Sequence, residues 1–209
     1  QDYYSSYLKD KGVDLNDHLE IGHLEGSLDI DPEPFDNFIK KYHDEALTKW
    51  YMPRPFYNFD SMREAVFLNS MGYNQHNTFE YNWGIEPHHN EILKDLIGDA
   101  NFDRMTLDKD TAGVRLLVYY PGHGIPLHTD SFNSYRVANG LKPGEGDVMR
   151  YFVAVSPWDW GHFLQVHDNM IHHWKPGYTV QIPDGVFHTS ANFGIQPKVT
   201  LTVTGIKNQ

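Results

Sequence analysis

The sequence contains no cysteine. Disulfide bonds therefore contribute nothing to the fold, and metal sites built from thiolate ligands are excluded. A chain without cysteine suits a reducing compartment, so we expect a cytoplasmic protein. Long apolar runs are also missing, because no stretch approaches the roughly eighteen apolar residues of a membrane span. The first ten residues lack the basic and apolar segments of a signal peptide. We expect no membrane partner.

Positive charge is scarce. The chain has 17 Lys and Arg against 28 Asp and Glu, which gives a formal net charge of −11. An acidic surface without a basic patch repels phosphate backbones, so we expect no nucleic-acid partner. Histidine, by contrast, is abundant, with 13 residues. Most of these must be surface or packing residues, so a single histidine predicts little without a partner at a suitable spacing.

The first half of the chain, residues 1–112, has mainly helical and irregular patterns. Asp31 and Pro32 are the N-cap and first-turn signals of a helix within residues 29–47. Two more helices are expected at residues 61–72, where Ser61 and Glu64 form a capping box, and at 88–100. The aromatic segments between them, at 50–60 and 72–87, are broken by proline and glycine. We expect irregular structure or short strands there.

The second half, residues 113–209, consists of short strand-like runs separated by turn residues. Several such runs predict a sandwich or barrel, with the N-terminal helices covering one outer face. With 209 residues and no linker, we expect a single α+β domain. The seven predicted strands are 114–120, 125–130, 149–155, 162–167, 178–183, 186–191 and 198–206.

Residues 131–147 interrupt this pattern as a long loop directly after a predicted strand. A loop of this length is often a lid or a binding loop. Tyr135 and Arg136 are then candidate substrate contacts. The alternative is a surface excursion with its own small packing.

His128 and Asp130 are two residues apart in a predicted strand. Side chains at this spacing point to the same face, so the imidazole and the carboxylate converge. His188, in a second strand-like segment, supplies another candidate ligand. Two histidines and one carboxylate form the facial triad of non-haem iron oxygenases, which leaves positions open for a co-substrate and dioxygen.

The final strand has two distinct faces. Lys198, ten residues after His188, starts it, and Thr200 follows on the same face. If this polar face lines the barrel interior, Lys198 can pair with the far carboxylate of a dicarboxylate, and Thr200 can add a hydroxyl. The alternative makes both ordinary surface residues. The opposite, apolar face should pack on the helices; its residues are Val199, Leu201 and Val203.

Residues 113–206 resemble the Fe(II)/2-oxoglutarate-dependent dioxygenases. The likeness depends on YYPGHGIPLHTD, MRYFVAV and WKPGYTVQIPDGVFHTSANFGIQPKVTLTVTG. The His-x-Asp pair and the ten-residue spacing from histidine to lysine are most similar to the prolyl-4-hydroxylase-like branch. PGHGIPLH, HHWKPG and FHTSAN are similar to the aspartyl/asparaginyl β-hydroxylase branch. The resemblance implies a double-stranded β-helix, or jelly roll, as the core.

The same resemblance implies roles for individual residues. His128, Asp130 and His188 would be the catalytic centre and bind Fe(II). Four residues would contact 2-oxoglutarate, with Lys198 at the distal carboxylate; they are Lys198, Thr200, Arg150 and Tyr120. For Arg150 the alternative is a structural salt bridge, and for Tyr120 it is a buried core position.

The implied activity is hydroxylation with consumption of dioxygen and 2-oxoglutarate and release of succinate and CO2. The substrate would be a peptidyl residue, prolyl or aspartyl/asparaginyl, or a small molecule. Asp130 favours hydroxylation, because halogenating members of the family lack this carboxylate. The alternative from another class is a non-catalytic cupin-like module that binds a metal or a ligand.

Overall fold

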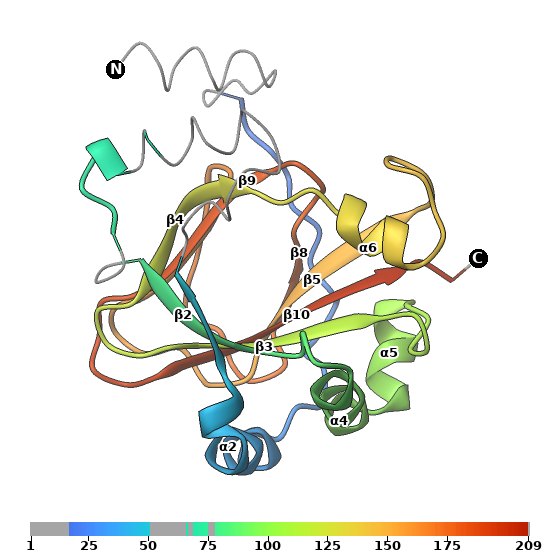
Figure 1. Ribbon diagram of the computed structural model, residues 1–209, viewed down its shortest axis with the longest axis horizontal. Helices are drawn as coiled ribbons and strands as arrows, with labels where there is room; N and C mark the ends of the chain where they lie inside the picture. The colour runs from blue at the N-terminus through green and yellow to red at the C-terminus, as the bar shows by residue number, and fades with distance from the viewer. Residues whose placement is uncertain (1–16, 51–65, 67–68, 75–77, 209) are drawn as a thin grey trace.

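The computed structural model describes residues 17–50, 66, 69–74 and 78–208 (Figure 1). Two antiparallel sheets face each other and enclose an interior space, and most of the helices lie outside one of them (Figure 1). This is an α+β fold with a jelly-roll core, as the strand pattern and the family resemblance predict.

Within the described residues, one sheet has six strands in the order β1-β2-β3-β10-β5-β8. Their bounds are Leu47–Trp50 (β1), Phe79–Trp83 (β2), Gly113–Tyr119 (β3), Lys198–Ile206 (β10), Val148–Ala154 (β5) and Thr179–Gln181 (β8). The other has four strands in the order β4-β9-β6-β7. Their bounds are Gly124–Thr129 (β4), Phe187–Asn192 (β9), His162–Val166 (β6) and Asn169–Ile171 (β7).

All seven strands predicted between residues 113 and 206 are present. The short β7, which pairs with β6 as a hairpin, was not predicted. β2 lies in a segment expected to contain irregular structure or short strands, and it joins the six-stranded sheet beside β3. The predicted segment at 50–60 lies almost entirely outside the described residues.

Two of the three predicted helices fall within the described residues. α2 spans Pro32–Lys41, and the Asp31 side chain caps it by accepting from the backbone N–H of Glu33 at 3.0 Å. The helix expected at 88–100 is interrupted at Gly98, whose φ is 80°. The two pieces are α4 (Pro87–Ile97) and α5 (Asp99–Met105). The helix predicted at 61–72 lies for the most part outside the described residues.

Other helical turns among the described residues include a 3-10 turn at His43–Glu45 and α6 at Asn133–Ala138. Among the described residues, no helix combines the length and apolar character that a bilayer crossing requires.

The main apolar core lies between the six-stranded sheet and the helices α2, α4 and α5 (Figure 1). Leu201 of β10 is fully buried there, together with Phe35 of α2 and Leu93 of α4. The predicted apolar face of the final strand therefore packs on the helices. Burial of each such large side chain contributes about 1.5–3 kcal/mol to the hydrophobic stabilisation of the fold.

The opposite face of β10 points into the space between the sheets. Lys198 and Thr200 are buried there, which excludes the alternative that they are surface residues. A second apolar cluster lines part of the same interior and includes Phe152 of β5 and Leu164 of β6. The interior is therefore apolar in part, and its polar remainder forms the candidate site.

Candidate metal centre

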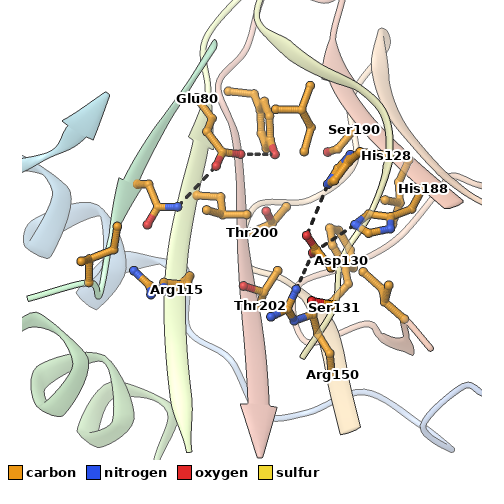
Figure 2. Close-up of a pocket in the computed structure, with 18 of the residues that line it drawn as sticks. Glu80, Arg115, His128, Asp130, Ser131, Arg150, His188, Ser190, Thr200 and Thr202 are labelled. Atoms are coloured by element: carbon orange, nitrogen blue, oxygen red, sulfur yellow. Dashed lines mark hydrogen bonds and ion pairs between the residues drawn. The ribbon is translucent and has the colours of Figure 1, made fainter. Parts of the chain in front are cut away.

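A cavity of about 270 Å³ lies between the two sheets (Figure 2). Its volume is at the small end of ligand pockets, which suits a metabolite-sized molecule. Residues from both sheets line it, and one side carries the predicted metal ligands His128, Asp130 and His188. Other polar lining residues are Glu80, Asn82, Arg115, Tyr119, Ser131, Ser134, Arg150, Ser190, Thr200 and Thr202.

The two histidines lie directly opposite each other on the adjacent strands β4 and β9. Their ring centroids are 4.3 Å apart. The Nδ1 of His128 contacts the carbonyl oxygen of Pro126 at 2.8 Å, and that of His188 contacts the carbonyl of Val186 at 2.9 Å. A carbonyl only accepts, so each Nδ1 carries the proton and each Nε2 presents its lone pair to the cavity.

Asp130 follows β4 and completes the group. Its Oδ1 lies 3.8 Å from the Nε2 of His128, and its Oδ2 lies 3.5 Å from the Nε2 of His188. One donor atom from each residue lies within 4.8 Å of the others, close enough for all three to bind one ion. The nitrogen and oxygen donors match the facial triad expected from the sequence.

Arg150 on β5 holds this carboxylate in place (Figure 2). It donates through a guanidinium nitrogen to Asp130 Oδ2 and through Nε to the hydroxyl of Thr204 at 2.8 Å. Its guanidinium carbon also lies 4.6 Å from the centroid of the Phe132 ring. The alternative reading of Arg150, a structural salt bridge, therefore describes its observed contacts.

The charge state of Asp130 follows from its surroundings. Enclosure in the cavity raises the pKa of its carboxyl, but the contact with His188 and the positive charge of Arg150 lower it by more. The net pKa lies well below the ordinary value, so Asp130 is ionised at physiological pH. An ionised carboxylate is the form that binds a metal.

Lys198 is fully buried behind the cavity wall. Its Nζ donates to the carbonyl oxygen of Phe163 and to the hydroxyl of Ser190, the latter at 2.6 Å. Ser190 lines the cavity, so the ammonium bonds directly to a residue of the cavity wall. Burial lowers the pKa of Lys198 to about 7, against a smaller rise from the charge of Glu80.

Thr200 and Thr202 line the cavity from β10. The hydroxyl oxygen of Thr200 is buried and has no hydrogen-bond partner among the described residues. Buried polar atoms nearly always have a partner, so an unsatisfied hydroxyl in a cavity wall indicates a position where a polar ligand atom can bind. This hydroxyl lies on the predicted co-substrate face.

Tyr120, which was expected near the co-substrate, does not line the cavity. It packs outside the barrel, with its ring centroid 5.2 Å from that of Tyr81. The preceding residue, Tyr119, lines the cavity and donates from its hydroxyl to Glu80 at 2.6 Å. Neighbouring residues of a strand face opposite sides, so the sequence indicated a tyrosine here but not which of the two.

Sequence reasoning missed a polar group on the opposite wall. Glu80 and Asn82 of β2 and Arg115 of β3 line the cavity, and Asn82 donates to Glu80 at 3.3 Å. The alternation of polar and aromatic residues in TFEYNW places Glu80 and Asn82 on one face, which is the signal that could have found them.

The loop 131–147 lies at the cavity, where Ser131 and Ser134 contribute to the wall. The predicted substrate contacts on this loop bind protein groups instead. Arg136 pairs with Asp184 at 2.6 Å, and the Tyr135 hydroxyl donates to the carbonyl of Thr111 at 2.9 Å. These two residues fix the loop to the barrel.

A comparison with protein-family models finds no match, and a comparison with curated proteins finds none either. Among solved structures, a predicted oxalate decarboxylase from Thermotoga maritima aligns over 61% of this chain and 81% of its own, at 11% identity and a TM-score of 0.36. A cupin 2 conserved barrel domain protein from Salinispora arenicola aligns over 46% of this chain and 63% of its own, at 15% identity and a TM-score of 0.30.

The cupin domain of Cnp3 from Schizosaccharomyces pombe aligns over 48% of this chain and 59% of its own, at 9% identity and a TM-score of 0.34. These similar structures are cupin and jelly-roll proteins. At such identities and TM-scores they assign no chemistry to this chain, and the fold described above is established from its own strand order. That fold carries a group of histidine and aspartate side chains compatible with a metal ion.

Proposed function

We propose that the protein is a non-haem Fe(II)- and 2-oxoglutarate-dependent dioxygenase that hydroxylates its substrate and releases succinate and CO2. The observation that carries this proposal is the content of one cavity. His128, Asp130 and His188 converge at one side of it, and the unsatisfied hydroxyl of Thr200 lies in its wall, with Lys198 behind.

The donor set fits ferrous iron. His128 and His188 present their unprotonated Nε2 atoms, and Arg150 holds the Asp130 carboxylate between them. Three protein ligands on one face leave positions open for a chelating co-substrate and for dioxygen. When bound, the iron would supply the oxidative chemistry, while the chain supplies geometry and exclusion of water.

The positive charge of Lys198 supports a co-substrate that carries two negative charges. A carboxylate that enters beside Ser190 and Thr200 would meet a hydroxyl from each, and it would draw the buried ammonium of Lys198 toward it. Lys198 can give up its bond to the Ser190 hydroxyl for a charge-assisted bond to the ligand. The far carboxylate of 2-oxoglutarate fits this role because its near end is the metal chelator.

The primary substrate, a small molecule or a peptidyl residue, would bind between the wall formed by β2 and β3 and the start of the loop 131–147. The polar residues Ser134, Asn82 and Arg115 line the cavity there and offer both donors and a positive charge. They can orient a polar substrate against the metal side of the cavity.

Isothermal titration calorimetry tests this proposal with Mn(II) as a stable substitute for Fe(II). We expect 2-oxoglutarate to bind only in the presence of the metal. His188→Ala should lose the binding of both. Lys198→Ala should keep the metal but weaken 2-oxoglutarate binding by at least about tenfold, since a charge-assisted bond contributes about 1.5–3 kcal/mol.

The exposed Lys175 gives a matched control, and Lys175→Ala should bind both ligands as the wild type does. Metal binding at His128 and His188 without any affinity for 2-oxoglutarate would contradict the oxygenase proposal. That result would favour the alternative, a cupin-like module that binds a metal or a ligand without this chemistry.

A further inference from the structure

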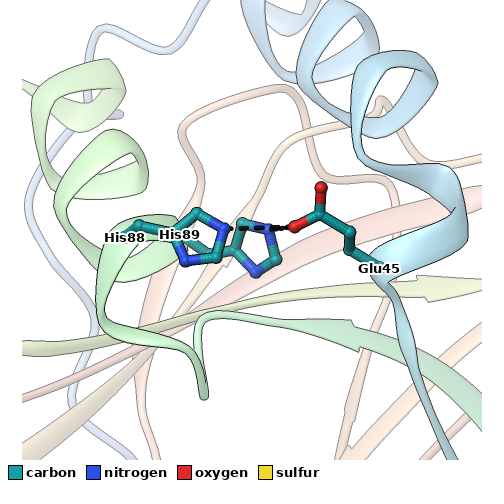
Figure 3. A group of neighbouring side chains, drawn as sticks. All are labelled: Glu45, His88 and His89. Carbon is teal, nitrogen blue, oxygen red and sulfur yellow. Dashed lines mark hydrogen bonds and ion pairs between the residues drawn. The ribbon is translucent and has the colours of Figure 1, made fainter.

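A second group of metal-ligating side chains lies away from the cavity. It consists of Glu45 at the end of the 3-10 turn and of His88 and His89 in the first turn of α4 (Figure 3). The Nε2 of His88 lies 3.1 Å from Glu45 Oε2, and the Nε2 of His89 lies 2.9 Å from the same oxygen. The two ring centroids are 4.0 Å apart.

His88 and His89 are consecutive residues of a helix, yet their side chains meet at one point. Side chains at i and i+1 of a helix do not face each other, so two neighbours rarely meet at one point. Here both imidazoles turn their Nε2 atoms to a single carboxylate oxygen (Figure 3). Packing alone would not require His88 to join His89, because the side chain of His88 is 55% exposed.

The carboxylate oxygen lies at a separation from each imidazole nitrogen that is close to what a small divalent cation needs. Zinc binds nitrogen and oxygen at about 2.0–2.2 Å in a tetrahedral arrangement, so its ligand atoms lie about 3.3–3.5 Å apart. The observed nitrogen-to-oxygen distances of 3.1 and 2.9 Å differ from this by a few tenths of an ångström. Small side-chain movements would admit the ion.

The surrounding residues hold the His89 side chain in place, while Glu45 and His88 remain accessible to solvent. His89 is 1% exposed, and its ring lies edge-on to Phe38 and Tyr42, at centroid distances of 5.6 and 5.1 Å. Glu45 and His88 are each about half exposed. A cation could therefore enter from solvent and keep water as its remaining ligand.

We infer that Glu45, His88 and His89 form a second site for a divalent cation of the zinc class, separate from the cavity. Such an ion would join the 3-10 turn that precedes β1 to the N-terminal turn of α4. Its role would be to fasten the helical layer to the edge of the six-stranded sheet. This inference is independent of the proposed oxygenase activity.

The test counts zinc bound per chain. The full chain is stripped with a chelator, loaded with Zn(II) and passed through gel filtration, and its metal content is measured by mass spectrometry. We expect two equivalents in the wild type, because the cavity site also binds zinc. His88→Ala and Glu45→Gln should each retain one, with at least about a tenfold weaker affinity at the second site.

Two controls locate the lost ion. His128→Ala should also retain one equivalent, and that remaining ion should disappear when His88→Ala is added. The adjacent exposed pair His172 and His173 provides a matched surface control, so His172→Ala should still bind two. One equivalent in the wild type that persists in His88→Ala, or two in both His88→Ala and Glu45→Gln, would overturn the inference and leave an ordinary ion-pair contact.

Discussion

At the scale of single residues, Lys198 places a buried charge beside the cavity at a cost in stability. Its ammonium is fully buried among the rings of Tyr119, Phe152 and Trp174. It bonds to two neutral oxygens, those of Phe163 and Ser190. A buried charge without a closely paired carboxylate is unfavourable, so a role in ligand binding accounts for its presence better than a role in folding.

Lys198→Met should therefore stabilise the ligand-free protein while it weakens 2-oxoglutarate binding. We expect the free energy of unfolding at pH 7 to rise by about 1–2 kcal/mol in urea denaturation, because an apolar chain of similar length replaces a buried charge. The difference should shrink as the pH rises from 7 toward 10.5. Over that range the unfolded wild type binds more protons than the folded one, so wild-type stability increases. A less stable Lys198→Met would indicate a structural lysine.

The lowered pKa of Lys198 also predicts how co-substrate affinity depends on pH. Only the protonated ammonium attracts a carboxylate, and the pKa of about 7 in the ligand-free protein marks where that form is lost. With metal saturating, the Kd for 2-oxoglutarate should be nearly constant below pH 6.5. It should rise roughly tenfold per pH unit above 7, up to the pKa of the bound state. A flat calorimetric profile from pH 6.5 to 8.5 would contradict the assigned contact.

Arg150 would act on a bound metal through Asp130. Its guanidinium orients the carboxylate and balances its charge, so Arg150→Met should weaken Mn(II) binding by about 10–100-fold. Metal titration followed by electron paramagnetic resonance measures this. Arg150→Lys should recover part of the affinity, because it restores the charge without the fork geometry. Unchanged metal affinity in Arg150→Met would show that Asp130 needs no such support.

At the scale of elements, all the strands from β3 to β10 except the short β7 could be predicted because turn residues separate them. Pairing could not. His128 and His188 are 60 positions apart in the numbering, and only the register of β4 with β9 places them opposite each other. That register shifts between Ile125 and His128, an irregularity that no local sequence pattern indicates.

The remaining misses have similar causes. Glu80 and Asn82 were overlooked because proline and glycine nearby favoured irregular structure, although the segment has the alternation of a short strand. Tyr119, which was not singled out from the sequence, lines the cavity in place of Tyr120, because a shift of one position along a strand reverses the face of the side chain. Lys198 was placed on the correct face, because the final strand alternates between apolar residues and threonines.

Gly177, in the turn before β8, shows how tightly the N-terminal segment packs on the barrel. Its φ is 81°, and a Cβ there would lie 1.9 Å from the carbonyl oxygen of Leu28. Gly177→Ala should therefore lower the free energy of unfolding by about 3 kcal/mol or more, from backbone strain and the clash together. Gly122, with φ 84° and nothing within 4 Å of an added Cβ, is the matched control.

Gly122→Ala should cost only the conformational strain, about 1 kcal/mol. Urea denaturation of both variants measures the difference. Equal costs for the two substitutions would mean that the contact between Leu28 and the turn at Gly177 is not maintained in solution.

At the scale of the whole molecule, the outer face of the larger sheet packs on helices, while its inner face lines the candidate site. The six-stranded sheet buries its outer face against α2, α4 and α5, and its inner face carries Thr200 and Thr202. The smaller sheet supplies both histidines. A site built from both sheets keeps its geometry only while the sheets stay together, so the helical layer contributes to the site by stabilising one wall.

The central claim is that iron and 2-oxoglutarate form a chelate on His128, Asp130 and His188. The most direct measurement is an anaerobic titration of the Fe(II)-loaded protein with 2-oxoglutarate, followed in the visible range. We predict a weak metal-to-ligand charge-transfer band that does not form with succinate, which lacks the keto group, or in His188→Ala. Bound Fe(II) without any band at saturating 2-oxoglutarate would contradict the account.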